Sequence, residues 1–124
     1  MSVFKDQAIF MAACGQSTEG RDDVQVRLYL RLIEEEYDEL QHAVNAVAAA
    51  DAVMDLIVVL IGYGLSQGWP MEKLWNEVIR SNMAKIDPDT GTVRKRADGK
   101  ILKPDGWTPP DLMTVMTKHG CSLA

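Results

Sequence analysis

EEEYDEL, residues Glu34–Leu40, and DAVMDLIVVLIGYG, residues Asp51–Gly64, place carboxylates in helical sequence that also carries the apolar residues of a core. Glu36 lies between Ile33 at i−3 and Leu40 at i+4, so its side chain follows the apolar stripe. Taking a bare carboxylate out of water is costly, so acids that face inward require raised pKa values or a bound cation. No Lys or Arg occurs between residues 34 and 67 to neutralise them. The pattern predicts a divalent-cation site.

The spacing of these acids brings them together. Glu36 and Glu39 are neighbours at i+3, Glu35 lies one turn before Glu39, and Asp51 lies one turn before Asp55. If the two helices pack antiparallel after a turn near residue 45, both acid pairs reach a similar height and face one another. Converging carboxylate oxygens favour Mg²⁺ or Mn²⁺.

Other interpretations of the acids were weighed. A run such as EEEYDE is often a solvated helix face, Asp51 alone fits a helix cap, and Asp55 alone fits a paired core acid. Glu39 and His42 have the Glu-x-x-His spacing of di-iron bundles, but that motif should occur twice, and the helix after residue 45 has no histidine. The acids taken together favour the cation.

Helical periodicity runs through most of the chain. Asp22 or Asp23 is expected to cap the second helix, and Asn45 to separate it from the third. The second helix shows an apolar stripe at spacings of four and three: Ile33, Tyr37, Leu40, Val44 and Val47. Helices are predicted over 3–14, 22–45, 46–67 and 71–86, with a final short helix from Asp111. The fold class is all-α: a four- to five-helix bundle with a C-terminal loop or small hairpin.

The 124 residues predict one domain, with a core over about 3–86 and a basic segment over about 87–112. Residues 1–78 hold 13 acids and 5 bases, whereas residues 79–103 hold 7 bases and 3 acids. An acidic part that can bind a cation, followed by a basic segment that can bind phosphates, suits a small polyanionic ligand bound through a metal. It does not suit nucleic acid, because proteins that bind nucleic acid are normally basic overall.

Cys14 and Cys121 have no disulfide or zinc spacing, the N-terminus lacks a secretory h-region, and the uncharged run 56–65 is too short to span a bilayer. We therefore expect a cytoplasmic protein. The helix over 46–67 is apolar nearly all round and must be covered on every side, which predicts a homodimer or homotetramer.

Four segments in order carry a resemblance to a known superfamily: EEYDEL (35–40), DAVMDLIVVLIGYG (51–64), EVIRSNMAKI (77–86) and DGKILKPDGW (98–107). They are similar to the motifs of the MazG-like all-α nucleoside triphosphate pyrophosphohydrolases, which include phosphoribosyl-ATP pyrophosphohydrolase and dimeric dUTPases. The resemblance covers about residues 3–112. It implies a helical bundle of MazG-like type, assembled as an oligomer, that binds Mg²⁺ through two acidic helices.

The resemblance also implies roles for the acids. The ExxE ligands fall on Glu36 and Glu39, with Glu35 as a further ligand or water-orienting base, and the last acid of the ExxD motif falls on Asp55. The Glu expected three residues before Asp55 is Ala52 in this chain, so Asp51 must take that part.

Substrate contacts follow in the same way: Asn82 and Lys85 match the SNMxK segment, and Lys100 and Lys103 match the loop that closes over the triphosphate, with Arg94 and Arg96 as weaker candidates. The implied reaction converts a nucleoside triphosphate to monophosphate and pyrophosphate by attack of a metal-activated water at the α-phosphorus.

Base selectivity would reside near the first helix and Gln16, where small side chains leave room for a purine, so dGTP is a candidate beside dUTP and dCTP. The alternatives are phosphoribosyl-ATP cleavage and a non-enzymatic helical interaction module. Enzymes of this kind also occur in phages, which would place the protein in a bacterial or a host cytoplasm.

Overall fold

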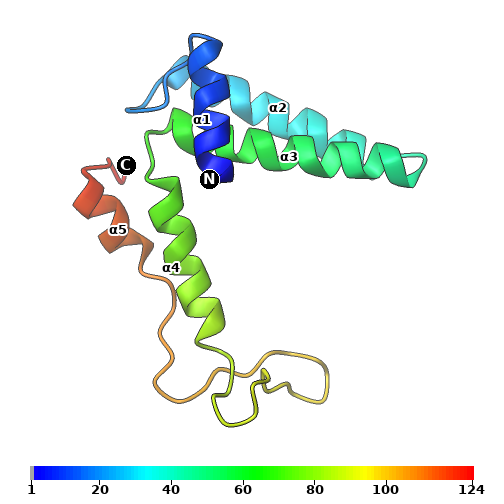
Figure 1. Cartoon of the computed structure of the whole chain (residues 1–124), viewed down its shortest axis with the longest axis vertical. Helices are drawn as coiled ribbons and strands as arrows, with labels where there is room; N and C mark the ends of the chain where they lie inside the picture. Colours follow the sequence, from blue (N-terminus) through cyan, green and yellow to red (C-terminus); the bar gives the residue numbers. More distant parts are fainter. Residues whose placement is uncertain (1) are drawn as a thin grey trace. The chain divides into compact units, whose positions relative to one another are not determined.

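The computed structural model describes residues 2–124, and the described residues form five helices (Figure 1). The predicted all-α class is confirmed. The helices are α1 (Val3–Ala13), α2 (Asp23–Gln41), α3 (Ala46–Ser66), α4 (Met71–Met83) and α5 (Leu112–His119).

Side-chain caps set the helix boundaries. Asp22 accepts a hydrogen bond from the Gln25 backbone N–H, and Asn45 accepts one from the Ala48 N–H at 2.8 Å. Asp111 caps α5 in the same way. Such side chains satisfy N–H groups that have no partner within the helix. The sequence signals at residues 22, 45 and 111 therefore predicted the starts of α2, α3 and α5 correctly. Helix α4 ends at Met83, before the predicted residue 86.

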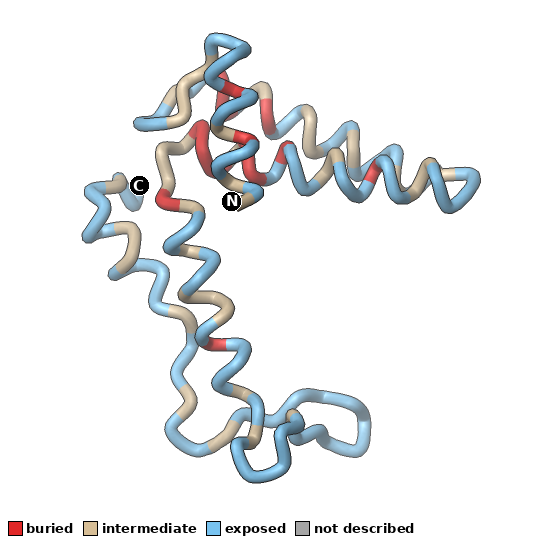
Figure 2. Tube along the Cα trace, viewed as in Figure 1, coloured by how far each residue is buried: buried red, intermediate tan, exposed pale blue. Residues whose placement is uncertain are grey.

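The chain packs as two compact units, Met1–Met71 and Glu72–Ala124. The expectation of a single domain over the whole chain stays a prediction. In the first unit, α2 and α3 form an antiparallel hairpin, and α1 packs against α3. Met11, Tyr29, Val59, Ile61 and Leu65 form its buried core, which Figure 2 shows near α1.

A buried polar cluster closes the α1 end of this hairpin. The Gln25 side-chain amide donates to the Ser17 carbonyl at 2.6 Å and to the Ser66 hydroxyl at 2.9 Å. The Ser66 hydroxyl donates to the Gly62 carbonyl, and the Asp22 N–H donates to the Ser66 carbonyl. Because each buried polar group has a partner, the loop before α2 is fixed to the end of α3.

The predicted apolar stripe on α2 is only partly buried. Ile33 and Leu40 are half-buried, but Tyr37, Val44 and Val47 are 54%, 89% and 80% exposed. Within one chain the stripe is therefore partly covered at Ile33 and Leu40 and open to solvent at the other three positions. Tyr37 lies in the last turns of α2, Val44 in the connection to α3 and Val47 in the first turn of α3, and none of them belongs to the core cluster that α1 packs against.

Helix α3 also has much exposed apolar surface. Its large apolar side chains with exposed surface are Val47, Val53, Met54, Ile57, Val58 and Leu60. Of the helices described, α3 alone has the length and apolar composition that a membrane span would need. Mostly buried core helices have the same two properties, but only 22% of the apolar stretch of α3 is buried within this chain, and Asp51 and Asp55 interrupt it.

The second unit contains most of α4, the segment 84–111 and α5. Two isolated antiparallel bridges, Ile86 with Val93 and Lys95 with Ile101, close successive turns of the segment. These bridges occupy the place of the predicted C-terminal loop or small hairpin, although no strand forms within residues 2–124.

Candidate functional site

The predicted acids of α2 and α3 interact with one another. The pKa of Glu36 is raised, first by partial burial, then by the charge of Glu39 and a hydrogen bond with its side chain, and then by the charges of Asp55 and Asp51. Nearby carboxylates disfavour the ionised form of each other. The antiparallel hairpin thus brings Glu36, Glu39, Asp51 and Asp55 close enough to share one electrostatic field.

Glu36 is the focus of this acidic cluster. Its Oε2 atom is buried and has no hydrogen-bond partner among the described residues. A buried carboxylate oxygen without a donor or cation is unfavourable, and unsatisfied groups of this kind are rare in folded proteins. The position of Glu36 on the apolar stripe accounts for the burial, as its spacing from Ile33 and Leu40 suggested.

The other acids are more open. Asp55 is half-buried, whereas Glu35, Glu39 and Asp51 are exposed. Within residues 2–124, no three His, Cys, Asp or Glu side chains converge tightly enough to form a complete metal site. Like charges repel, so these carboxylates have no reason to close on one another without a cation.

The predicted phosphate-binding residues of the second unit fall into two groups. Lys85 donates to the Asn82 side-chain oxygen at 3.2 Å, and the ammonium groups of Lys85 and Lys103 lie 5.3 and 4.6 Å from the ring centroid of Trp107. Arg96 instead forms a two-point ion pair with Asp98, and the Lys100 N–H donates to that same carboxylate.

Arg94 and Lys100 have exposed side chains in this segment. The structure thus brings Asn82, Lys85 and Lys103 together and ties Arg96 into a turn.

Gln16, the predicted base-selecting residue, is half-buried and accepts a hydrogen bond from the Tyr29 hydroxyl at 2.6 Å. Burial raises the pKa of Tyr29 in this environment, and the negative charge of a Cys14 thiolate would raise it further. Met11, on the same helix as the small side chains near Gln16, is fully buried in the core. A role of Gln16 in base selection stays a prediction.

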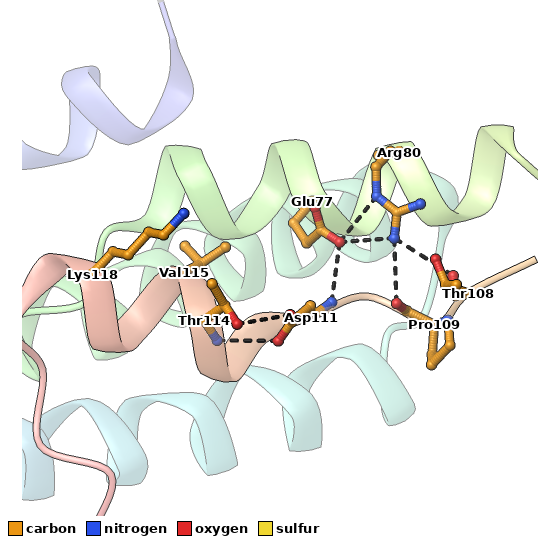
Figure 3. A pocket seen from close by; sticks show the side chains of 8 residues that line it. All are labelled: Glu77, Arg80, Thr108, Pro109, Asp111, Thr114, Val115 and Lys118. Carbon is orange, nitrogen blue, oxygen red and sulfur yellow. Dashed lines mark hydrogen bonds and ion pairs between the residues drawn. The ribbon is translucent and has the colours of Figure 1, made fainter.

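A cavity of about 480 Å³ in the second unit includes none of the predicted site residues (Figure 3). Arg80 donates to Glu77 at 2.8 Å and to the Pro109 carbonyl at 3.3 Å, and the Asp111 N–H donates to Glu77. These hydrogen bonds join the start of α5 to α4, so we assign the cavity a structural role.

Trp107 is the residue whose role the sequence did not reveal. Its indole ring lies near the ammonium groups of Lys85 and Lys103, and nothing in the spacing of KILKPDGW predicts this arrangement. Contacts from residues 22 and 4 positions apart along the chain are not encoded in a local pattern.

Comparison with known proteins gives one family. The family model described as phosphoribosyl-ATP pyrophosphohydrolase matches residues 10–82, which include all five predicted acids and Asn82 but end before Lys85. No curated protein matches the chain. The match spans more than half of the chain and contains both acidic helices. The chain therefore belongs to the phosphoribosyl-ATP pyrophosphohydrolase family, within the MazG-like all-α superfamily of nucleotide pyrophosphohydrolases.

Proposed function

We propose that this nucleotide pyrophosphohydrolase is Mg²⁺-dependent, also accepts Mn²⁺, and converts a nucleoside or deoxynucleoside triphosphate, with dGTP as one candidate, to the monophosphate and pyrophosphate. Family membership supports the general activity. The observation that carries the proposal is the buried, unpartnered Oε2 of Glu36 in the field of three further carboxylates.

These residues fit a divalent cation. All the donors are hard carboxylate oxygens, which Mg²⁺ and Mn²⁺ prefer, and a cation would satisfy the buried oxygen of Glu36. We assign Glu36, Glu39, Asp51 and Asp55 as its ligands, with Glu35 as a further candidate. When bound, the cation would neutralise phosphate charge and make a coordinated water more acidic.

The protein's own groups would position the reactants. Glu35 and Glu39 are exposed and can accept a proton from the attacking water, as a general base must. Lys85, Lys100 and Lys103 would bind phosphate oxygens, with Asn82 orienting Lys85. Attack at the α-phosphorus breaks the bond to the bridging oxygen, and pyrophosphate leaves with that oxygen.

Phosphoribosyl-ATP is the second candidate substrate, because the matching family carries that name. The SNMAK and DGKILKP segments favour the nucleotide-pool reaction instead, and all of DGKILKP lies beyond the matched residues. Pyrophosphate release should be measured for all common NTPs and dNTPs and for phosphoribosyl-ATP, with Mg²⁺ or Mn²⁺. Turnover of phosphoribosyl-ATP alone would refute the nucleotide-pool proposal.

The bond that breaks can be identified with ¹⁸O-labelled water. Attack at the α-phosphorus puts the label in the monophosphate, whereas attack at the β-phosphorus puts it in pyrophosphate. Label found only in pyrophosphate would contradict the proposed chemistry.

A non-enzymatic interaction module is the rival from a different class. It predicts no stabilisation by Mg²⁺ with nucleotide, whereas a ligand that binds only the folded state raises the melting temperature. A melting curve unchanged by saturating Mg²⁺ and every nucleotide tested would favour the module.

We further propose that the protein works as a homodimer or homotetramer in the cytoplasm, without nucleic acid or membrane as a partner. The exposed apolar side chains of α3 support a second copy as the cover for this helix. Surfaces of this kind commonly mark interfaces.

A further inference from the structure

Trp107 is fixed at both its ring and its backbone. Its indole N–H donates to the Ser81 carbonyl at 2.7 Å, and its backbone N–H donates to the Pro104 carbonyl at 3.1 Å. Ser81 is itself 2% exposed and lies in the last turn of α4. The orientation of the half-buried ring is thus set by a helix and by the turn that precedes it.

Two ammonium groups share this one ring. The Nζ atoms of Lys85 and Lys103 lie 5.3 and 4.6 Å from its centroid, within the range of a cation–π interaction. Within residues 2–124, neither lysine forms an ion pair with a carboxylate, whereas Arg80 and Arg96 both do. The pair therefore carries two uncompensated positive charges.

Each ammonium group is attracted by the ring, but the two like charges near one ring also repel each other. An anion with several negative oxygens would remove the repulsion and use the N–H donors that the ring leaves free.

We propose that Trp107 is a positioning residue, whose indole holds Lys85 and Lys103 ready to bind the oligophosphate group of the substrate. This inference rests on the proposed function for its biological ligand, but the binding of inorganic pyrophosphate tests it without turnover. The hydrogen bond to Ser81 fixes the ring relative to α4, and the contacts with the ring fix the two ammonium groups relative to α4 in turn.

The first experiment follows the emission of Trp107 in full-length protein that carries Trp69→Phe and Trp75→Phe. Inorganic pyrophosphate is added with a chelator present, so that the acidic cluster cannot contribute through a metal. We expect a saturable change in emission as the ammonium groups move from the ring to the phosphates. No change at any pyrophosphate concentration would overturn the proposal.

The second experiment compares pyrophosphate affinity by calorimetry. Lys85→Met, Lys103→Met and Trp107→Leu should each weaken binding about fivefold, the factor that corresponds to one exposed cation–π contact. Trp107→Phe keeps an aromatic face and should recover most of the affinity. Trp75→Leu, which removes an exposed tryptophan from α4, is the matched control and should bind as the parent does.

Kinetics separate positioning from a structural role. Trp107→Leu should raise KM about fivefold with kcat within about twofold, because the lysines bind ground state and transition state alike. Unchanged pyrophosphate affinity in Trp107→Leu would overturn the proposal, and if that variant fails to fold, the emission experiment decides. Pyrophosphate binding that depends on Trp107 in a protein that hydrolyses no triphosphate would refute the proposed function and leave the positioning role intact.

Discussion

The ring of Tyr29 lies directly against the backbone of Gly62, so that a Cβ atom at position 62 would overlap the Cε1 and Cδ1 atoms of the ring. Tyr29 is 4% exposed and cannot move outward without breaking the core, and its hydroxyl is held by Gln16. The absence of a side chain at Gly62 thus sets how closely α2 approaches α3, and with it the distance between the acids on the two helices.

We predict that Gly62→Ala destabilises the fold by about 1–3 kcal/mol, the usual cost of overpacking a core, despite the better helix propensity of alanine. The measurement is the free energy of unfolding in urea. Gly64→Ala is the matched control, because its new Cβ would meet only the flexible end of Met71. It should change stability by less than about 1 kcal/mol. Equal effects of the two substitutions would show that Tyr29 does not limit the approach.

Local signals predicted most of the fold. Capping residues at 22, 45 and 111 defined three helix starts, and the 3.6-residue period defined the helices themselves. The end of α4 was misplaced because the helical pattern continues to Ile86, which instead pairs with Val93 across a turn. The pairing of Ile86 with Val93 overrides the local helix propensity, and this pairing cannot be predicted from the local sequence pattern.

The candidate site was predictable in part for the same reason. The proximity of Glu36, Glu39, Asp51 and Asp55 follows from two periodic helices and one turn. The pairing of Arg96 with Asp98 and the packing of both lysines on Trp107 depend on an irregular segment. Side-chain positions in such a segment depend on the conformation of its turns, which the spacing of residues along the sequence does not determine.

Replacement of Glu36 should separate catalysis from stability. We predict that Glu36→Gln lowers pyrophosphohydrolase activity about 100-fold or more, since outer-shell changes alone cost metal sites 10- to 100-fold. The variant should also lose stabilisation by Mg²⁺ while its metal-free form unfolds at the same or a higher temperature. Glu34→Gln, an exposed neighbour, is the control and should keep activity. Parental turnover in Glu36→Gln would remove Glu36 from the site.

The pKa of Glu36 also predicts a pH dependence. It is raised above its usual value of 4.5, so the folded metal-free chain keeps this proton where the unfolded chain has lost it. The free energy of unfolding should therefore fall as pH rises from about 4.5 through the folded-state pKa, and then stay level. The difference between parent and Glu36→Gln isolates this contribution. A difference that does not change with pH would contradict the raised pKa.

Glu77 predicts the opposite behaviour in the second unit. A hydrogen bond from Arg80 and one from the Asp111 N–H hold the pKa of Glu77 below its usual 4.5. Its contribution to stability is present above about pH 4.5 and should be lost as pH falls through the lowered pKa.

Glu77→Gln should flatten the acid side of the stability curve, as measured by thermal unfolding between about pH 2 and 6. Glu72→Gln is the control, since Glu72 is exposed in the first turn of the same helix. An acid-side decline of the same size in Glu77→Gln would assign the decline to other groups.

Ile57 tests the proposed second copy. Val53, Ile57 and Leu60 are 41%, 42% and 48% exposed and recur at i, i+4 and i+7, so they form one stripe on α3. At about 100° per residue this stripe lies on the opposite side of the helix from Asp51 and Asp55.

A lysine at Ile57 would place an unpaired charge in an apolar interface without touching the acids, and burying such a charge is costly. We therefore expect the parent to have the mass of a dimer or tetramer by light scattering and Ile57→Lys to be smaller. Leu123→Lys, at an exposed apolar position in the C-terminal tail, should leave the mass unchanged. A parent that is monomeric in buffer would refute the oligomer, and a parent that stays in solution only with detergent would show that lipid, and not a second copy, covers α3.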